Sequence, residues 1–281
     1  MKKQKIAIIG VGLLGGSLAL ALKKRGGSQL VGWNHRASSR RKAAKLLPVV
    51  PTFEKAVHGA DIILLCGHSS SVAPSLWQAM LYLKAETLVM DVSSVKGEVV
   101  KEAGHIKGIE KFFVPCHPMA GKEKSGAAHA TADLYKNKFI FITPLKGNPK
   151  TLVQRAVRFW KGIGAIPLII DARLHDRSVA LTSHLPHLLA AAYMNLYEKQ
   201  EARHAGIRRA VGSGFRDFTR IAGSNPAMWT DIVEMNGNEI EDFLTGYIQN
   251  LQSLRKNLRK GNRRHWLSFF EKARTAREKL Q

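Results

Sequence analysis

One histidine of this chain stands in a context that suits proton transfer. His117 follows the apolar run of residues 112–114 and directly precedes Pro118, in a turn that continues to Glu123. Imidazole titrates near neutral pH, so this side chain could accept or donate a proton in a reaction. A lone histidine is more often structural. The turn around His117, opposite Ser94 on a neighbouring strand end, favours the catalytic interpretation.

A glycine-rich turn near the N-terminus predicts a dinucleotide-binding site. Gly10, Gly12 and Gly15 have the GxGxxG spacing and lie between the apolar run of residues 6–9 and a helical pattern. Glycines at these positions let the backbone approach a pyrophosphate, which then sits at the N-terminus of the helix. The alternative is a tight turn between strand and helix that binds no ligand. We predict that a nicotinamide dinucleotide binds at Gly10, Gly12, Leu13, Leu14 and Gly15.

The end of the second predicted strand bears on which cofactor is used. About 20 residues beyond the last glycine a carboxylate usually binds the ribose 2′-hydroxyl, and this chain has Asn34 in that region. An uncharged residue does not repel a 2′-phosphate, and Arg36 and Ser38 stand close by to bind one. The sequence therefore favours NADP, with Asn34, Arg36 and Ser38 as contacts. NAD beside a basic surface loop is the alternative.

Further polar residues follow other predicted strands. Ser94 and Lys96 come after Asp91, where a hydroxyl and an ammonium could both reach the nicotinamide region. Asp91 could instead cap the helix that follows. His68 comes after the run of residues 62–65, in a segment that would pass near the cofactor, and we assign it to a loop rather than to catalysis.

The C-terminal half carries histidines and arginines that could bind an acidic ligand. His184 and His187 are three residues apart on one predicted helix face, a spacing that could also hold a metal. No third ligand stands at metal spacing in the sequence, so we expect no metal but a substrate contact or a buried hydrogen bond. Arg220 suits a carboxylate through paired hydrogen bonds. Arg216 is more simply interpreted as pairing with Asp217 on the surface.

Short apolar runs alternate with amphipathic segments up to about residue 171, and this alternation predicts how the motifs are positioned. It indicates an α/β fold in which an N-terminal Rossmann-type, doubly wound parallel sheet occupies residues 1–172. Over residues 173–281 the pattern predicts an all-helical second domain whose apolar faces need a partner. Pro186 should kink its first helix. The runs are 6–9, 30–32, 62–65, 87–90, 112–114, 139–142 and 166–170, and the helices are 173–203, 237–260 and 262–280.

The composition bears on partners and location. Across 281 residues, 44 Lys and Arg against 21 Asp and Glu leave a charge of +23. The basic clusters lack the interleaved aromatic residues that stack bases, so we interpret them as solvated faces and expect no nucleic-acid partner. Cys66 and Cys116 lie in apolar runs, where we expect no disulfide. The N-terminus imitates a secretory signal, but its glycines argue against one, and no other window is long enough to span a membrane. We expect a cytoplasmic protein without a membrane partner.

Together these motifs resemble the prephenate/arogenate dehydrogenases of tyrosine biosynthesis. The resemblance runs in order along nearly the whole chain. It rests on the glycine turn, residues 91–96, the HPMAG run from His117 with Glu123 and residues 125–126, SHLPH at 183–187, and GFRDFTRIA at 214–222 with Pro226, Met228 and Trp229.

The resemblance implies an oxidative decarboxylation. Hydride would leave C4 of a cyclohexadienol for the nicotinamide while the ring carboxylate departs as CO2. His117 would accept the hydroxyl proton, with Ser94 hydrogen-bonded to the hydroxyl or the imidazole. Arg220 and His187 would hold the substrate carboxylates. The other substrate-binding residues implied are Glu123 at the entrance, Ser213, and Trp229, which would approach the partner subunit of a homodimer formed through the helical domains.

The sequence excludes some alternative functions better than others. Prephenate, which would give 4-hydroxyphenylpyruvate, differs from arogenate, which would give tyrosine, only in a keto or an amino group, and no residue distinguishes the two. The family usually has a Pro-containing turn where this chain has Gly67-His68. Sibling reductases such as β-hydroxyacid dehydrogenases would need a catalytic lysine within residues 181–195, which contain none. From another class, the alternative is a non-catalytic basic protein that binds a cofactor or nucleic acid.

Overall fold

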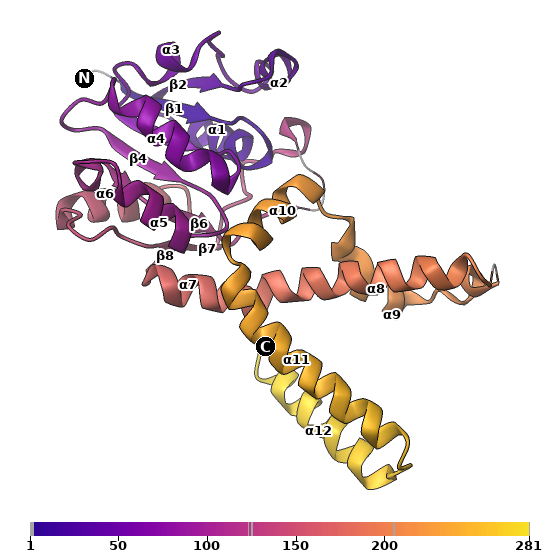
Figure 1. Ribbon diagram of the computed structural model, residues 1–281. Coiled ribbons are helices and arrows are strands. Elements are labelled where there is room, and N and C mark those ends of the chain that lie inside the picture. The colour runs from indigo at the N-terminus through magenta and orange to yellow at the C-terminus, as the bar shows by residue number, and fades with distance from the viewer. Residues whose placement is uncertain (1–2, 123, 125, 205, 281) are drawn as a thin grey trace.

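A five-stranded parallel sheet forms the core of the N-terminal half in the computed structural model, which describes residues 3–122, 124, 126–204 and 206–280 (Figure 1). The strand order is β2-β1-β3-β4-β5. The chain thus starts inside the sheet and winds outward in both directions, which confirms the predicted doubly wound fold. The strands are β1 (Gln4–Ile9), β2 (Ser28–Trp33), β3 (Ile62–Leu65), β4 (Leu88–Asp91) and β5 (Phe113–Val114).

Helices cover both faces of this sheet. Ile6 and Ile8 of β1 belong to one buried apolar cluster, whereas Ala7 and Ile9 belong to the other, because successive side chains of a strand point to opposite faces. A strand buried on both faces needs a continuous apolar run, which is why these strands show little alternation in sequence. The first cluster includes residues of α1 (Leu13–Arg25) and α6 (Lys150–Lys161), and the second includes residues of α3 (Phe53–Val57), α4 (Val72–Met80) and α5 (Gly97–Gly104).

A second, three-stranded sheet departs from the single parallel sheet that the sequence pattern predicts. β6 (Cys116–Pro118) pairs antiparallel with β7 (Phe139–Ile142), and β7 pairs parallel with β8 (Ile166–Ile169). Pro115 separates β5 from β6 and has no N–H to continue the first ladder. Its carbonyl instead accepts the N–H of Thr143 at 3.0 Å. The chain therefore leaves one sheet and enters the other immediately before His117.

The C-terminal part is helical, as predicted, but its first helix is interrupted. α7 (Ala172–Val179) is followed by a π-helical turn, η4 (Ala180–His184), and then by α8 (Leu185–Glu201). The widened turn ends two residues before Pro186, which cannot donate a backbone hydrogen bond, so the predicted irregularity is a π-helical turn. The remaining elements are η5 (Ile207–Ala210), α9 (Ser213–Thr219), η6 (Arg220–Gly223), α10 (Pro226–Met235), α11 (Gly237–Leu258) and α12 (Arg263–Glu278).

Two helical arms extend from the nucleotide-binding half. Figure 1 shows α8 pointing one way, with α9 beside it, and the α11–α12 hairpin pointing another. α10 lies between these arms and the sheet. Short elements complete the N-terminal half: α2 (Ala37–Ala43), η1 (Ser69–Ser71), η2 (Ile109–Lys111) and η3 (Ala127–His129). In the part of the chain that the structure describes, no helix is both long and apolar enough to cross a membrane.

Candidate active site

The glycine turn between β1 and α1 is shaped for close approach of the backbone. Gly10 has φ +96, and a Cβ there would lie 2.8 Å from the backbone of Cys66. A Cβ on Gly15 would lie 2.3 Å from the carbonyl oxygen of Gly10. Among the described residues, no side chain caps α1 and no acidic residue lies in its first turn. The open N-terminus of α1 therefore fits the pyrophosphate of a dinucleotide.

A cleft runs from this turn along the carboxyl edge of the sheet. It consists of two cavities of about 350 Å³ and about 670 Å³, which share Gly12, Gly67, His68 and Asn225 among their walls. Leu13, Leu14, Ser94 and His117 line the smaller cavity, and Gly10, Asn34 and Arg36 line the larger one. The structure thus brings eight sequence-predicted residues to one cleft: Gly10, Gly12, Leu13, Leu14, Asn34, Arg36, Ser94 and His117.

The larger cavity ends at a basic loop after β2. Asn34 is buried, and its Oδ1 accepts the N–H of Val11 at 2.8 Å. This contact ties the loop to the glycine turn. Arg40 turns back and donates from Nη1 to the carbonyl oxygens of Asn34 and His35, both at 2.8 Å. Arg36 is exposed and borders the cavity, so it is the guanidinium best placed to meet a ligand there.

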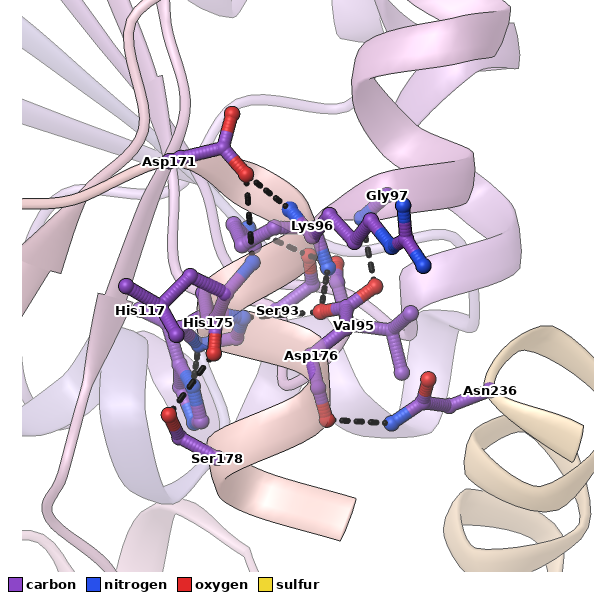
Figure 2. A network of polar contacts seen from close by, with 12 residues as sticks. Ser93, Val95, Lys96, Gly97, His117, Asp171, His175, Asp176, Ser178 and Asn236 are labelled. Carbon is purple, nitrogen blue, oxygen red and sulfur yellow. Dashed lines mark hydrogen bonds and ion pairs between the residues drawn. The ribbon is translucent and has the colours of Figure 1, made fainter. Parts of the chain in front are cut away.

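His117 lies within strand β6 rather than in the predicted turn. It is 8% exposed and lines the smaller cavity together with Ser94. Its Nδ1 lies 2.8 Å from Nε2 of His175, and Nδ1 of His175 lies 2.7 Å from Oδ1 of Asp176 (Figure 2). Burial, and then unfavourable electrostatic interactions with His175 and Lys96, hold the pKa of His117 well below 6.5. The imidazole is therefore neutral at neutral pH and able to accept a proton.

A buried ion pair supports the strand that carries His117. Lys96 pairs with Asp91, and both side chains are fully buried. Lys96 Nζ donates to the carbonyl oxygen of Cys116 at 2.8 Å, and Asp91 Oδ1 accepts the N–H of Cys116 at 2.8 Å. The expectation that Lys96 reaches the nicotinamide region is therefore wrong, because its ammonium points into the core. Asp91 does not cap the next helix, since Asp176 accepts the N–H groups of Lys96 and Gly97 that begin α5.

Two histidines of the helical part have different surroundings. His184 is buried, and its Nδ1 lies 3.0 Å from Nδ2 of Asn236. Burial lowers the pKa of His184 to about 4. His187 stacks on Trp229 with ring centroids 3.8 Å apart, and its Nδ1 donates to the carbonyl oxygen of Ser183 at 2.9 Å. The Nε2 of His187 is therefore left for another partner.

Comparison with known protein families identifies the family to which the chain belongs. The nucleotide-binding domain of prephenate dehydrogenases matches residues 18–168, and the dimerization domain of prephenate dehydrogenases matches residues 171–272. The chain belongs to the prephenate dehydrogenase family. It is accordingly an NAD(P)-dependent oxidoreductase, and the sequence resemblance is confirmed.

Individual members of the prephenate dehydrogenase family match along nearly the whole chain. Prephenate dehydrogenase of Bacillus subtilis is 31% identical over 99% of this chain and 76% of its own length. Cyclohexadienyl dehydrogenase of Zymomonas mobilis is 32% identical over 98% of this chain and 96% of its own length. The crystal structure of prephenate dehydrogenase from A. aeolicus in complex with hydroxyphenyl propionate and NAD+ is 28% identical, with a TM-score of 0.92 over 100% of this chain and 99% of that one.

Other predicted site residues of this family member lie away from the cleft walls. Gly15 packs beneath the glycine turn. Ser38 is exposed in the first turn of α2, and Ser213 is exposed at the start of α9. Arg220 begins η6, and its charge contributes to lowering the pKa of His187, although burial is the main cause. Glu123 lies outside the described residues.

The indole of Trp229 lies between the two helical histidines. One face stacks on His187, and His184 meets the ring edge-on with centroids 5.9 Å apart. Its N–H is buried and has no hydrogen-bond partner among the described residues. A ligand or a second protein chain could provide that partner.

Sequence reasoning missed several residues of this prephenate dehydrogenase family site. Asn225 and Met228, near the start of α10, line the cleft from the helical side. His68, which we expected in a loop near the cofactor, also lines the cleft, but its contact was not foreseen: its Nδ1 lies 3.5 Å from the Asp231 carboxylate. His175 stands behind His117. No local sequence signal could have found His175, since 58 residues separate it from His117.

Proposed function

We propose that this protein is a prephenate dehydrogenase that converts prephenate to 4-hydroxyphenylpyruvate by oxidative decarboxylation. The observation that carries the proposal is that a neutral imidazole, His117, lines the same cleft as the glycine turn of a dinucleotide site. The A. aeolicus relative, which was crystallised with hydroxyphenyl propionate and NAD+, supports it.

His117 acts as the general base in this proposal. Its Nε2 accepts the proton of the C4 hydroxyl, and Ser94, on the same cavity wall, hydrogen-bonds to the hydroxyl or to the imidazole. The bound dinucleotide supplies a hydride acceptor. As the C4–H bond and the bond to the ring carboxylate break, CO2 leaves and the ring electrons become aromatic. His117 then returns the proton to the phenolic oxygen, so the reaction releases no net proton.

The substrate carboxylates reach beyond the cleft walls toward His187 and Arg220 of the helical half. His187 keeps a free Nε2, and Arg220 lies close enough for its charge to affect the pKa of His187. A guanidinium suits a carboxylate, and His187, whose Nδ1 already donates to Ser183, donates from Nε2 once the ring is protonated beside the bound carboxylate. Trp229 packs on His187 and orients its ring. Ser213 and Glu123 stay predictions from the family resemblance.

NADP is the proposed cofactor, with NAD as the alternative. Arg36 borders the cavity beyond the glycine turn, and Asn34 places no carboxylate there that would repel a 2′-phosphate. Charge-assisted hydrogen bonds from the guanidinium would favour the phosphorylated ribose. Ser38, exposed in the first turn of α2, is the further predicted contact.

A homodimer through the helical arms accounts for their apolar surface. Many large apolar side chains of these arms are more than a third exposed, and a monomer leaves them in water. The match to a dimerization domain supports this assembly. The cytoplasmic location stays a prediction. The exposed side chains of the arms are Tyr193, Leu196, Phe218, Tyr247, Ile248, Leu251, Leu258, Leu267, Phe269 and Phe270.

Arogenate is the second candidate substrate. It is favoured by the similarity to a cyclohexadienyl dehydrogenase that spans 96% of that relative. Arogenate has an amino group where prephenate has a keto group, so the ring chemistry proposed for His117 is the same.

The test is turnover with two substrates and two cofactors. Purified protein is mixed with prephenate or arogenate and with NAD+ or NADP+, while the absorbance of the reduced nicotinamide and the aromatic product are followed. We expect the fastest turnover with prephenate and NADP+. Faster turnover with arogenate would replace the substrate assignment. No turnover in any combination, from folded protein with bound dinucleotide, would refute the proposal.

A further inference from the structure

We infer that His175, held by Asp176, fixes the tautomer of His117 and is a positioning residue for its proton transfer. The inference rests on the proposed function, because His117 is the base of that reaction. Figure 2 shows the line of contacts from His117 through His175 to Asp176, which crosses from strand β6 to helix α7. The nucleotide-binding half thus provides the base, and the helical half sets its protonation pattern.

Asp176 determines where the protons lie, because a carboxylate can only accept hydrogen bonds. Its Oδ1 accepts the N–H of Lys96 at 2.8 Å, and its Oδ2 accepts the N–H of Gly97 at 2.6 Å. These backbone donors belong to the start of α5 and hold the carboxylate in one orientation. Oδ1 also lies 2.7 Å from Nδ1 of His175. Nδ1 of His175 must therefore carry a proton.

The tautomer of His175 sets that of His117. A neutral imidazole protonated at Nδ1 offers Nε2 as an acceptor. Nε2 of His175 lies 2.8 Å from Nδ1 of His117, so His117 donates from Nδ1 and keeps its lone pair on Nε2. His175 is fully buried and His117 is 8% exposed, which limits competition from water. His117 therefore meets a ligand in the cleft with the basic nitrogen.

The same contacts support the imidazolium that forms during the reaction. When Nε2 of His117 takes the hydroxyl proton, Nδ1 still donates to His175, and the negative charge of Asp176 stands beyond it. This charge opposes the positive charge of Lys96, one of the groups that disfavour protonation of His117. When the proton returns to the phenolic oxygen, His117 regains its starting tautomer without any rearrangement.

The tautomer can be measured directly, without substrate or cofactor. Wild-type protein carrying 15N-labelled histidine is examined by NMR at pH 7.5, and the signals of His117 are assigned by their loss in His117→Asn. We expect a neutral ring with the proton on Nδ1. A His117 signal with the proton on Nε2 would overturn the inference even if the enzyme turns over prephenate, so its failure is distinct from that of the proposed function.

Two substitutions of His175 separate positioning from mere packing. His175→Phe keeps a buried ring but removes the acceptor, and we expect kcat to fall about a hundredfold while dinucleotide affinity changes less than twofold. His175→Gln retains an oxygen that can accept from His117 Nδ1, and it should keep kcat within about tenfold of wild type. His105→Phe, on the exposed end of α5, is the matched control and should leave kcat unchanged.

Equal kcat values for the Phe and Gln variants would overturn the inference, because the acceptor would then have no effect beyond packing. If His175→Phe fails to fold, the tautomer of His117 in the wild type and in His175→Gln still tests the inference. A Nδ1–H ring in both supports the inference, and a Nε2–H ring in either one refutes it.

Discussion

The side chains of Lys96 and Asp91 form an ion pair that is completely shielded from solvent. Both residues also bond to the backbone of Cys116, one at its carbonyl and the other at its N–H. The pair therefore holds the start of strand β6 on two sides, one residue before His117. Its place in the core, and not in the cleft, makes it a support for the site.

Removing one partner of this pair should destabilise the protein strongly. In Lys96→Met the carboxylate of Asp91 is left buried without its counter-charge, which costs about 3–5 kcal/mol. Urea unfolding followed by circular dichroism measures the loss. Lys101→Met is the matched control, because Lys101 pairs with Glu98 on the surface and should leave the unfolding midpoint nearly unchanged. Similar midpoints for the two variants would show that the buried pair contributes little.

The buried His184 should make the protein less stable as the pH falls. Its folded pKa is about 4, against 6.5 in an exposed state. Above pH 6.5 the His184 imidazole is neutral in the folded and the unfolded state, so it does not lower the free energy of unfolding. Between pH 6.5 and 4 only the unfolded state binds the proton, which stabilises the unfolded state and lowers the free energy of unfolding. One such group contributes at most about 1.4 kcal/mol per pH unit. Urea unfolding of His184→Gln between pH 7 and 5 should show a shallower loss than wild type, and an equal slope would contradict this.

Two glycines of the dinucleotide turn should respond differently to alanine. A Cβ at Gly15 would meet the Gly10 carbonyl oxygen, whereas a Cβ at Gly12 would meet no described protein atom within 4 Å and would face the cleft. Gly15→Ala should lower the melting temperature. Gly12→Ala should keep the melting temperature but weaken NADP binding at least tenfold, because its methyl occupies the space of the pyrophosphate. Protein fluorescence titration measures the affinity. Unaltered binding by Gly12→Ala would place the dinucleotide elsewhere.

Arg36 should distinguish the two cofactors. In Arg36→Ala we expect the KM for NADP+ to rise at least tenfold while the KM for NAD+ stays within about twofold, since the guanidinium would meet only the 2′-phosphate. Arg41→Ala, at an exposed position in helix α2, which begins directly after Arg36, is the control for a general loss of positive charge. Equal changes in the KM values for NADP+ and NAD+ in Arg36→Ala would contradict the proposed preference for NADP.

The fold was predictable because its signals are local. The continuous apolar runs of β1 and β3 and the glycines after β1 define the parallel sheet, and the strand order confirms the doubly wound fold. The second sheet was not separated from the first in prediction, because a strand's apolar pattern does not state which sheet it joins. Pro115, which directs the chain from one to the other, is the signal that was overlooked.

The site was predictable only in part, for a related reason. Residues that follow strands, such as Ser94 and His117, reach the cleft because strand ends meet at one edge of a sheet. Lys96, two residues after Ser94, points into the core instead, because Asp91 and the carbonyl of Cys116 attract its ammonium. His175 could not be found at all, since its role depends on a contact between the two halves of the chain.

The most direct test of the account is the rate of hydride transfer in His117→Asn. Enzyme with bound NADP+ is mixed with saturating prephenate, and the absorbance of reduced nicotinamide is followed through a single turnover, with NADP+ affinity measured separately. We predict a rate about a hundred- to ten-thousandfold below wild type with unchanged cofactor affinity, because the general base is gone. A rate within threefold of wild type would contradict the central claim that His117 accepts the substrate proton.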